Sequence, residues 1–164
     1  MRDIQEWVSY PKYTTLAGDN FNRKSPSVID LYAGVGTIGL TVGGDNVTLI
    51  EINEFAVAEM QRNIAALGCA NARAILAPSE KALDFITPNY IVIVDPPRAG
   101  LHANVVAKLL EVAPPRIIYL SCNPVTQARD AVLLTEKYNI RAHRGYNFFP
   151  RTPHIEHLVV LDRK

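Results

Sequence analysis

Short, continuously apolar runs that alternate with helix-like segments are the feature that most limits the folds open to this 164-residue chain. Several of the runs stop at a glycine, an acid or a pair of prolines, and a segment with helical spacing of apolar residues follows. Strands that are buried on both faces are continuously apolar, and strands that alternate with helices usually pair in parallel. The pattern therefore predicts an α/β domain with a mostly parallel sheet that is covered on both faces.

The individual elements follow from the same pattern. We expect strands at 27–34, 46–53, 72–79, 90–97 and 116–123, and two more in 140–164 that FPRTPH interrupts. We expect helices at 36–44, 54–68, 79–86, 103–113 and 125–138, with Ser79 and Gly68 as caps. Residues 1–26 have no clear period and are expected to be an irregular or helical lead-in to a domain that spans 27–164.

Composition excludes several functional classes. The two cysteines, Cys69 and Cys122, have no CxxC spacing, so we expect neither an iron–sulfur cluster nor a cysteine-rich zinc site, and no other metal site. The net charge is +1, so any RNA contact must be local or supplied by something else. No apolar run approaches the ~18 residues of a membrane span, and the N-terminus lacks a signal-peptide pattern. These features predict a cytoplasmic protein that does not contact membranes.

A glycine loop follows the first expected strand. Gly34, Gly36 and Gly39 match GxGxxG, and Glu51 closes the next strand. Such glycines allow a ligand to approach the backbone, and an acid at that position can accept hydrogen bonds from both ribose hydroxyls of an adenosine. The pattern fits a nicotinamide dinucleotide and S-adenosylmethionine equally well. A glycine-rich turn with a surface glutamate is the structural alternative.

Two further strand ends carry reactive side chains. Asp95 stands in the stiff turn VDPPRAGL, where it contacts a ligand or caps a helix, and Arg98 is free to meet a phosphate or a carbonyl. Cys122 stands where a strand opens into a turn and a helix, whose N-terminal dipole stabilises a thiolate. A small buried hydrophobe is the alternative for a lone cysteine, and it is the interpretation that Cys69 receives.

The late stretch FPRTPHIEH contains two aromatic rings, an arginine, a histidine and an acid. Alternation along a strand puts His154 and Glu156 on the same face. An acid in an otherwise apolar strand costs free energy unless it has a partner or a function. An edge strand with solvated polar residues is the alternative interpretation.

Taken together, DLYAGVGTIGL, IEIN, VDPPRAGL, YLSCNPVTQARD and FPRTPHIEHLVVL resemble the 5-methyluridine RNA methyltransferase family, in the family's order, over residues 27–164. The resemblance implies the Rossmann-like, seven-stranded, mostly parallel sheet of class I methyltransferases. It implies S-adenosylmethionine as cofactor and transfer-RNA or ribosomal-RNA uridine as substrate. The implied site residues are a nucleophile at Cys122, a base at Glu156, and cofactor contacts at Tyr32, Gly34, Thr37, Glu51 and Asp95.

The implied reaction begins with attack of the thiolate on carbon 6 of an unpaired or flipped uridine. Carbon 5 then takes the methyl group, and the base removes the proton that remains there. Members of the family usually carry an RNA-binding barrel, so the resemblance implies that a separate RNA-binding domain or subunit assists. The alternatives are a non-catalytic module that binds S-adenosylmethionine or RNA, a nicotinamide-dependent oxidoreductase, and a cytosine-5 RNA methyltransferase. The late His-x-Glu base favours uridine.

Overall fold

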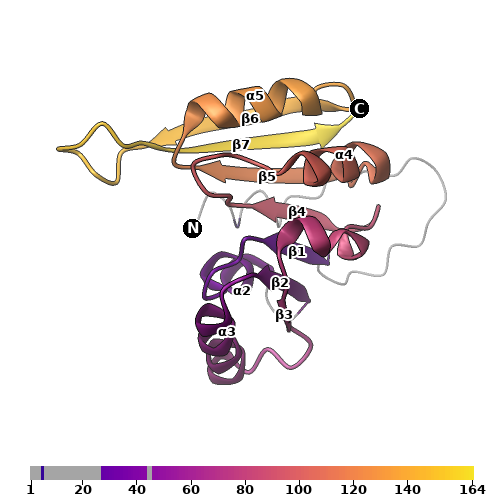
Figure 1. Ribbon diagram of the computed structural model, residues 1–164, viewed down its shortest axis with the longest axis vertical. Coiled ribbons are helices and arrows are strands. Elements are labelled where there is room, and N and C mark those ends of the chain that lie inside the picture. Colours follow the sequence, from indigo (N-terminus) through magenta and orange to yellow (C-terminus); the bar gives the residue numbers. More distant parts are fainter. Residues whose placement is uncertain (1–4, 6–26, 44–45) are drawn as a thin grey trace.

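A computed structural model describes residue 5, residues 27–43 and residues 46–164. The lead-in predicted at 1–26 therefore lies, except for one residue, outside the described part. The described residues form one seven-stranded sheet with the strand order β3-β2-β1-β4-β5-β7-β6 (Figure 1). The strands are β1 (Val28–Leu31), β2 (Val47–Glu51), β3 (Arg73–Leu76), β4 (Ile91–Val94), β5 (Arg116–Ser121), β6 (Tyr138–Tyr146) and β7 (Glu156–Arg163). The predicted seven-stranded sheet is confirmed.

Strand direction brings distant parts of the chain to one edge of the sheet. β1 pairs in parallel with β2 and β4, β2 with β3, and β4 with β5. β7 runs antiparallel to both of its neighbours, β5 and β6. Because β7 enters the sheet in the reverse direction, its first residue lies at the edge where β4 and β5 end.

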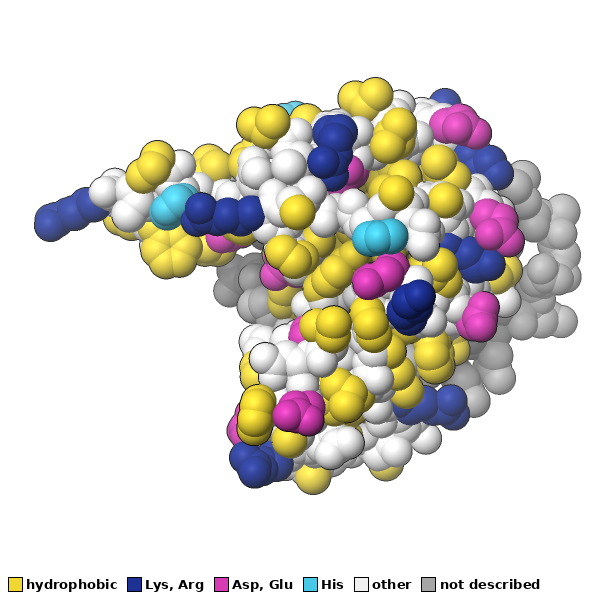
Figure 2. Space-filling model, viewed as in Figure 1, with side chains coloured by type: hydrophobic (Ala, Val, Ile, Leu, Met, Phe, Trp, Pro, Cys, Tyr) yellow, Lys and Arg dark blue, Asp and Glu magenta, His cyan; other side chains and the backbone are white. Residues whose placement is uncertain are grey.

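Helices cover both faces of the sheet. They are α2 (Thr37–Gly43), α3 (Glu54–Leu67), α4 (Ala103–Val112) and α5 (Pro124–Leu134). One buried cluster joins α4 and α5 to the sheet through residues such as Leu109 and Leu134, and a second joins α2 and α3 through Leu40 and Met60. Figure 2 shows charged side chains of both signs around apolar ones on the visible face. Gly68 ends α3 with φ 67°, as its predicted capping role requires.

The predicted helix at 79–86 is wrong. The segment instead forms two single 3-10 turns, η1 (Ser79–Lys81) and η2 (Leu83–Phe85), on either side of a non-helical Ala82. Pro78, and not Ser79, stands at the cap position, and no side-chain hydrogen bond closes it. The segment's conformation is set by the burial of its apolar side chains, such as Ile86, against the sheet.

Other predicted boundaries also differ by a few residues, and two of these differences bear on packing and on the site. The helix predicted at 125–138 begins at Pro124 and ends at Leu134, and Tyr138 starts β6. The Tyr138 ring is buried, and its hydroxyl donates to the Leu109 carbonyl at 3.2 Å, so tertiary packing overrides the helical pattern. His154 was expected in the last strand, but β7 begins two residues later, at Glu156.

Candidate active site

The glycine loop joins β1 to α2 through residues in the left-handed region. Gly34 and Gly36 have φ values of 56° and 83°, and Tyr32 also has a positive φ, of 64°. A Cβ at Gly36 would lie 3.0 Å from the Met60 side chain, so this glycine permits close packing. A Cβ at Gly34 would meet none of the described residues within 4 Å. The backbone at Gly34 is therefore open to an approaching ligand.

Glu51, the last residue of β2, holds its carboxylate against this loop. Its Oε2 accepts a hydrogen bond from the Gly34 amide at 2.9 Å. Its Oε1 accepts from the amides of Ile52 at 2.9 Å and Asn53 at 2.8 Å. A carboxylate offers roughly four acceptor positions, so three backbone donors leave about one for a ligand hydroxyl. The carboxylate is thus held in one orientation beside the open Gly34.

Asp30 lies inside β1, beneath the loop, and sequence reasoning did not assign it to the site. Its Oδ2 accepts from the Gly39 amide at 2.8 Å, and among the described residues its buried Oδ1 has no hydrogen-bond partner. Burial raises the pKa of Asp30 from 3.8 to about 7. The hydrogen bond from Gly39 lowers this pKa, and the negative charges of Asp95 and Glu51 raise it further. The signal in the sequence was an acid within a fully apolar strand.

Asp95, Cys122 and Glu156 meet at the edge where β4 and β5 end and β7 begins. Ser121 is the last residue of β5 to pair with β7, opposite His157, so the next residues of the two segments, Cys122 and Glu156, lie near each other at this edge. The Asp95 residue keeps contact with solvent, but partial desolvation by its surroundings, with a smaller contribution from the charge of Glu156, raises its pKa from 3.8 to about 6. The three predicted residues therefore lie together.

The turn that carries Cys122 is rigid. The Asn123 amide donates to Ser121 Oγ at 3.0 Å, and Asn123 Oδ1 caps α5 by accepting from the Val125 amide at 3.2 Å. Asn123 Nδ2 and the Thr126 hydroxyl both donate to the Arg98 carbonyl, at 3.0 and 3.1 Å. These last two bonds tie the cysteine turn to the loop that follows Asp95. The free thiol of Cys122 is half-buried.

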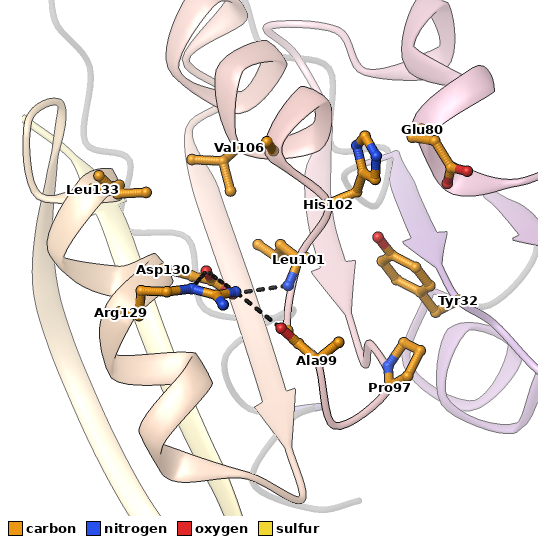
Figure 3. A pocket seen from close by; sticks show the side chains of 12 residues that line it. Tyr32, Glu80, Pro97, Ala99, Leu101, His102, Val106, Arg129, Asp130 and Leu133 are labelled. Carbon is orange, nitrogen blue, oxygen red and sulfur yellow. Dashed lines mark hydrogen bonds and ion pairs between the residues drawn. The ribbon is translucent and has the colours of Figure 1, made fainter.

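A buried carboxylate, Asp130 of α5, anchors the same loop from the other side (Figure 3). Its Oδ2 accepts from the Leu101 amide and from the Tyr119 hydroxyl, both at 2.8 Å. Its Oδ1 accepts from Arg129, whose Nη2 also donates to the Ala99 carbonyl at 2.9 Å. Gly100 has φ 83°, and a Cβ there would lie 2.5 Å from Asp130. Arg129 is therefore occupied in holding the loop.

Gln127 joins the cysteine strand to the glutamate strand. Its buried Nε2 donates to the carbonyls of Tyr119 at 2.9 Å and His157 at 3.0 Å. Both amide hydrogens are then used, so Oε1 is the acceptor in its 2.6 Å contact with His157 Nδ1. His157 must carry its proton on Nδ1, and burial lowers the pKa of this histidine, which favours the neutral ring. Gln127 thereby links β5 to β7 close to Cys122 and Glu156.

Comparison with known proteins places the chain in a family. A family model described as tRNA (uracil-5-)-methyltransferase matches residues 11–164. The chain belongs to this family. An uncharacterized RNA methyltransferase of Nitratidesulfovibrio vulgaris is 40% identical over 146 residues, which cover 84% of this chain and 31% of that protein. Another from Enterococcus faecalis is 38% identical over 169 residues, which cover 97% of this chain and 36% of that protein.

Solved structures agree with this family. The Pyrococcus abyssi tRNA (uracil-54, C5)-methyltransferase, in complex with S-adenosyl-L-homocysteine, has a TM-score of 0.80 and 34% identity. The match covers 98% of this chain and 36% of that one. TrmN from Thermus thermophilus, at 20% identity and a TM-score of 0.63 over 85% of this chain and 44% of that one, supports the fold alone. The class I methyltransferase fold is confirmed, and the chain spans about a third of the length of its curated relatives.

Within the family fold, one predicted cofactor contact is separated from the rest. The Tyr32 side chain lines an open cavity of about 560 Å³ and points towards His102 (Figure 3). Gly34, Thr37, Glu51, Asp95 and Cys122 do not line this cavity. Tyr32 bonds to the His102 backbone and to Ser79, and burial raises its pKa. Thr37 is exposed at the start of α2. A cofactor contact at Tyr32 stays a prediction. Because the side chain points away from the glycine loop, the Tyr32 backbone would have to make that contact.

Two absences complete the description of the site. Within residues 27–43 and 46–164, no three histidine, cysteine, aspartate or glutamate side chains gather closely enough to hold a metal ion. In the same part of the chain, every helix is too short or too polar to cross a bilayer.

Proposed function

We propose that residues 27–164 are the catalytic domain of an S-adenosylmethionine-dependent RNA methyltransferase that modifies carbon 5 of uridine. The observation that supports this proposal is the β5–β7 register, which ends at the pair Ser121 and His157 and so brings the next residues, Cys122 and Glu156, to one edge of the sheet. Family membership supports the same reaction class. A nucleophile and a base at one strand edge meet the two needs of methylation at a pyrimidine carbon.

The residues around the glycine loop fit S-adenosylmethionine. The open backbone at Gly34 leaves room for it, and the fixed carboxylate of Glu51 can accept from a ribose hydroxyl. Asp95 contributes a second carboxylate nearby, and Thr37 a hydroxyl at the start of α2. When bound, the cofactor supplies an electrophilic methyl group. The chain's own residues hold it between the ends of β1, β2 and β4.

The protein's part in the chemistry belongs to two side chains. The Cys122 thiolate forms a bond from Sγ to carbon 6 of the uracil ring, which makes carbon 5 electron-rich enough to take the methyl group. Glu156 then removes the hydrogen left on carbon 5 as a proton, and the electron pair of that bond reforms the 5,6 double bond. The carbon 6–Sγ bond breaks, and Cys122 returns as thiolate. Methyl donor and uridine become demethylated donor, 5-methyluridine and a proton.

The substrate is proposed to be transfer or ribosomal RNA in which the target uridine is unpaired or flipped out of the stack. The Pyrococcus abyssi relative is a tRNA methyltransferase, which favours tRNA. A net charge of +1 provides little non-specific attraction to phosphates. We therefore propose that an RNA-binding domain or subunit assists. Fusing such a domain to this chain should raise RNA affinity and turnover together.

A trapped intermediate tests the proposal. In Glu156→Gln, the thiol still attacks and the methyl group is still transferred, but proton removal stalls. A covalent protein–RNA adduct should then accumulate as a shifted band on a denaturing gel. Cys122→Ala, in the presence or absence of the second change, should show neither adduct nor methylation. Methylation that survives Cys122→Ala would mean that the nucleophile is assigned wrongly.

A further inference from the structure

The hairpin that joins β6 to β7 extends the molecule beyond the sheet. Residues 147–155, here termed the arm, project from the edge at which β4 and β5 end (Figure 1). Figure 2 shows that the projection carries apolar, basic and histidine side chains. The arm therefore lies beside the proposed reaction centre, because it follows the end of β6 and leads directly into Glu156, the first residue of β7.

Aromatic rings lead from the reaction centre to the arm. Tyr146 pairs with Glu156 in the β6–β7 ladder, so these two side chains share a face, and Cys122 follows directly after the last β5–β7 pair, Ser121 and His157. The Phe148 ring stacks on the Tyr146 ring with centroids 5.5 Å apart and planes 10° apart. Phe148 is 65% exposed, and its neighbour Phe149 is 52% exposed. One face of a fixed aromatic stack is thus open to solvent, about two strands from the thiol.

Basic residues predominate in the arm and in the strand that leads to it. Residues 138–156 contain three arginines and one acid, whereas the whole chain has a net charge of only +1. Arg141 and Arg151 are exposed. Arg98, from the loop after Asp95, reaches the base of the arm, where its Nη2 lies 3.4 Å from His154 Nδ1. Positive charge interleaved with exposed rings matches the surfaces that hold single-stranded nucleic acids.

We propose that the arm binds the single-stranded RNA that flanks the target uridine, with Phe148 stacking on a neighbouring base and Arg151 meeting a phosphate. This inference rests on the proposed function, because it takes the thiol to mark the position of the target base. A duplex does not fit this surface, since its bases are already stacked on each other and present no free face. An acidic protein surface would use the arginines but would gain nothing from an aligned aromatic stack.

The test measures reversible binding of a short, unpaired, fluorescein-labelled RNA of uridine and cytidine by fluorescence anisotropy at low salt. All proteins carry Cys122→Ala, so no adduct contributes to the signal. Removing one base–aromatic stack should weaken binding roughly 5- to 150-fold in Phe148→Ala, whereas Phe148→Trp should bind as the parent does. Phe148→Leu keeps the apolar surface but loses the ring, so it should weaken binding as Phe148→Ala does.

Phe55 of α3 provides the matched control. It is 79% exposed, more than Phe148, and its helix packs near β2 and β3, far from β6 in the strand order. Phe55→Ala should leave binding unchanged. Arg151→Ala should lower the slope of log affinity against log salt by roughly 0.7, the value for one phosphate on a single strand. Binding to a duplex of the same sequence should be the same in Phe148→Ala and the parent.

Unchanged single-strand binding in Phe148→Ala would overturn the proposal, as would an equal loss in Phe55→Ala or an equal loss on the duplex. The assay uses neither cofactor nor turnover, so its result is independent of the reaction itself. If the proposal for the arm is wrong, Glu156→Gln should still form the covalent protein–RNA adduct. A failed reaction would leave the anisotropy differences intact.

Discussion

Removing the carboxylate of Asp130 should destabilise the fold far more than a single surface change. The Asp130 side chain is 2% exposed and accepts hydrogen bonds from the Tyr119 hydroxyl and the Leu101 amide, both of which are buried. Asp130→Ala leaves both donors without this acceptor. Arg129 also loses its partner, but its side chain is 55% exposed and can turn to water at little cost.

The expected loss follows from these donors. An unsatisfied buried donor costs about 1–3 kcal/mol, so two donors predict a loss of about 2–6 kcal/mol in the free energy of unfolding. That is a large part of the 5–15 kcal/mol typical of a domain. Tyr119→Phe removes one hydroxyl and leaves the carboxylate its other partners, so it should cost only about 0.5–1.5 kcal/mol.

Urea unfolding followed by circular dichroism measures these differences. Asp84→Ala is the matched control, because Asp84 is exposed on η2 and should shift the free energy by no more than about 0.5 kcal/mol. If Asp130→Ala lowers the free energy of unfolding no more than Asp84→Ala does, the carboxylate does not anchor the loop, and the reasoning from buried donors is wrong.

Three further predictions concern the carboxylates around the glycine loop. Glu51→Ala should weaken S-adenosylmethionine binding by about 1–3 kcal/mol in calorimetric titration, and binding of a nicotinamide nucleotide instead of the sulfonium compound or its product would refute the cofactor. The pKa of Asp30 is raised from 3.8 to about 7, so its contribution to stability is complete below about pH 4 and is lost as pH rises through about 7. In the parent protein, the free energy of unfolding should therefore fall by up to about 1.4 kcal/mol per pH unit between about pH 4 and pH 7, and this fall should be absent in Asp30→Asn. The same pH dependence in both proteins would argue against the raised pKa. The pKa of Asp95 is about 6, so cofactor affinity should fall as the pH drops below about 6. In Asp95→Asn, affinity should not change with pH in this range. In Glu156→Gln, the midpoint of the fall in affinity should lie at a lower pH, because one neighbouring negative charge is gone.

The elements of the sheet could be predicted because each is encoded locally. A run such as Ile91–Val94 is apolar on both faces, and Gly68 marks the end of its helix. The segment 79–86 failed because burial of separate side chains, and not local periodicity, sets its path. Tyr138 was assigned to a helix for the same reason, since only the folded chain shows its contact with Leu109.

The site residues also divide into those that the sequence predicts and those that only the folded chain reveals. Asp95 and Cys122 follow apolar runs, so their places at strand ends could be predicted. The approach of Glu156 to Cys122 depends on the antiparallel β5–β7 register, which ends at Ser121 and His157 and which the sequence does not state. Asp130 and Gln127 were missed because their partners are far away in the sequence and become visible only in three dimensions. A polar residue on the buried side of a helix was the available signal.

The most direct test of the central claim uses RNA that carries tritium on carbon 5 of uridine. The full chain, with S-adenosylmethionine and RNA in excess, should release tritium to water as 5-methyluridine appears in the digested RNA by mass spectrometry. One tritium should be released for each methyl group transferred, and Cys122→Ala should give neither product. A methyl group on cytidine or ribose, methylation that retains the tritium, or product formed by Cys122→Ala would contradict the claim that Cys122 and Glu156 methylate uridine at carbon 5.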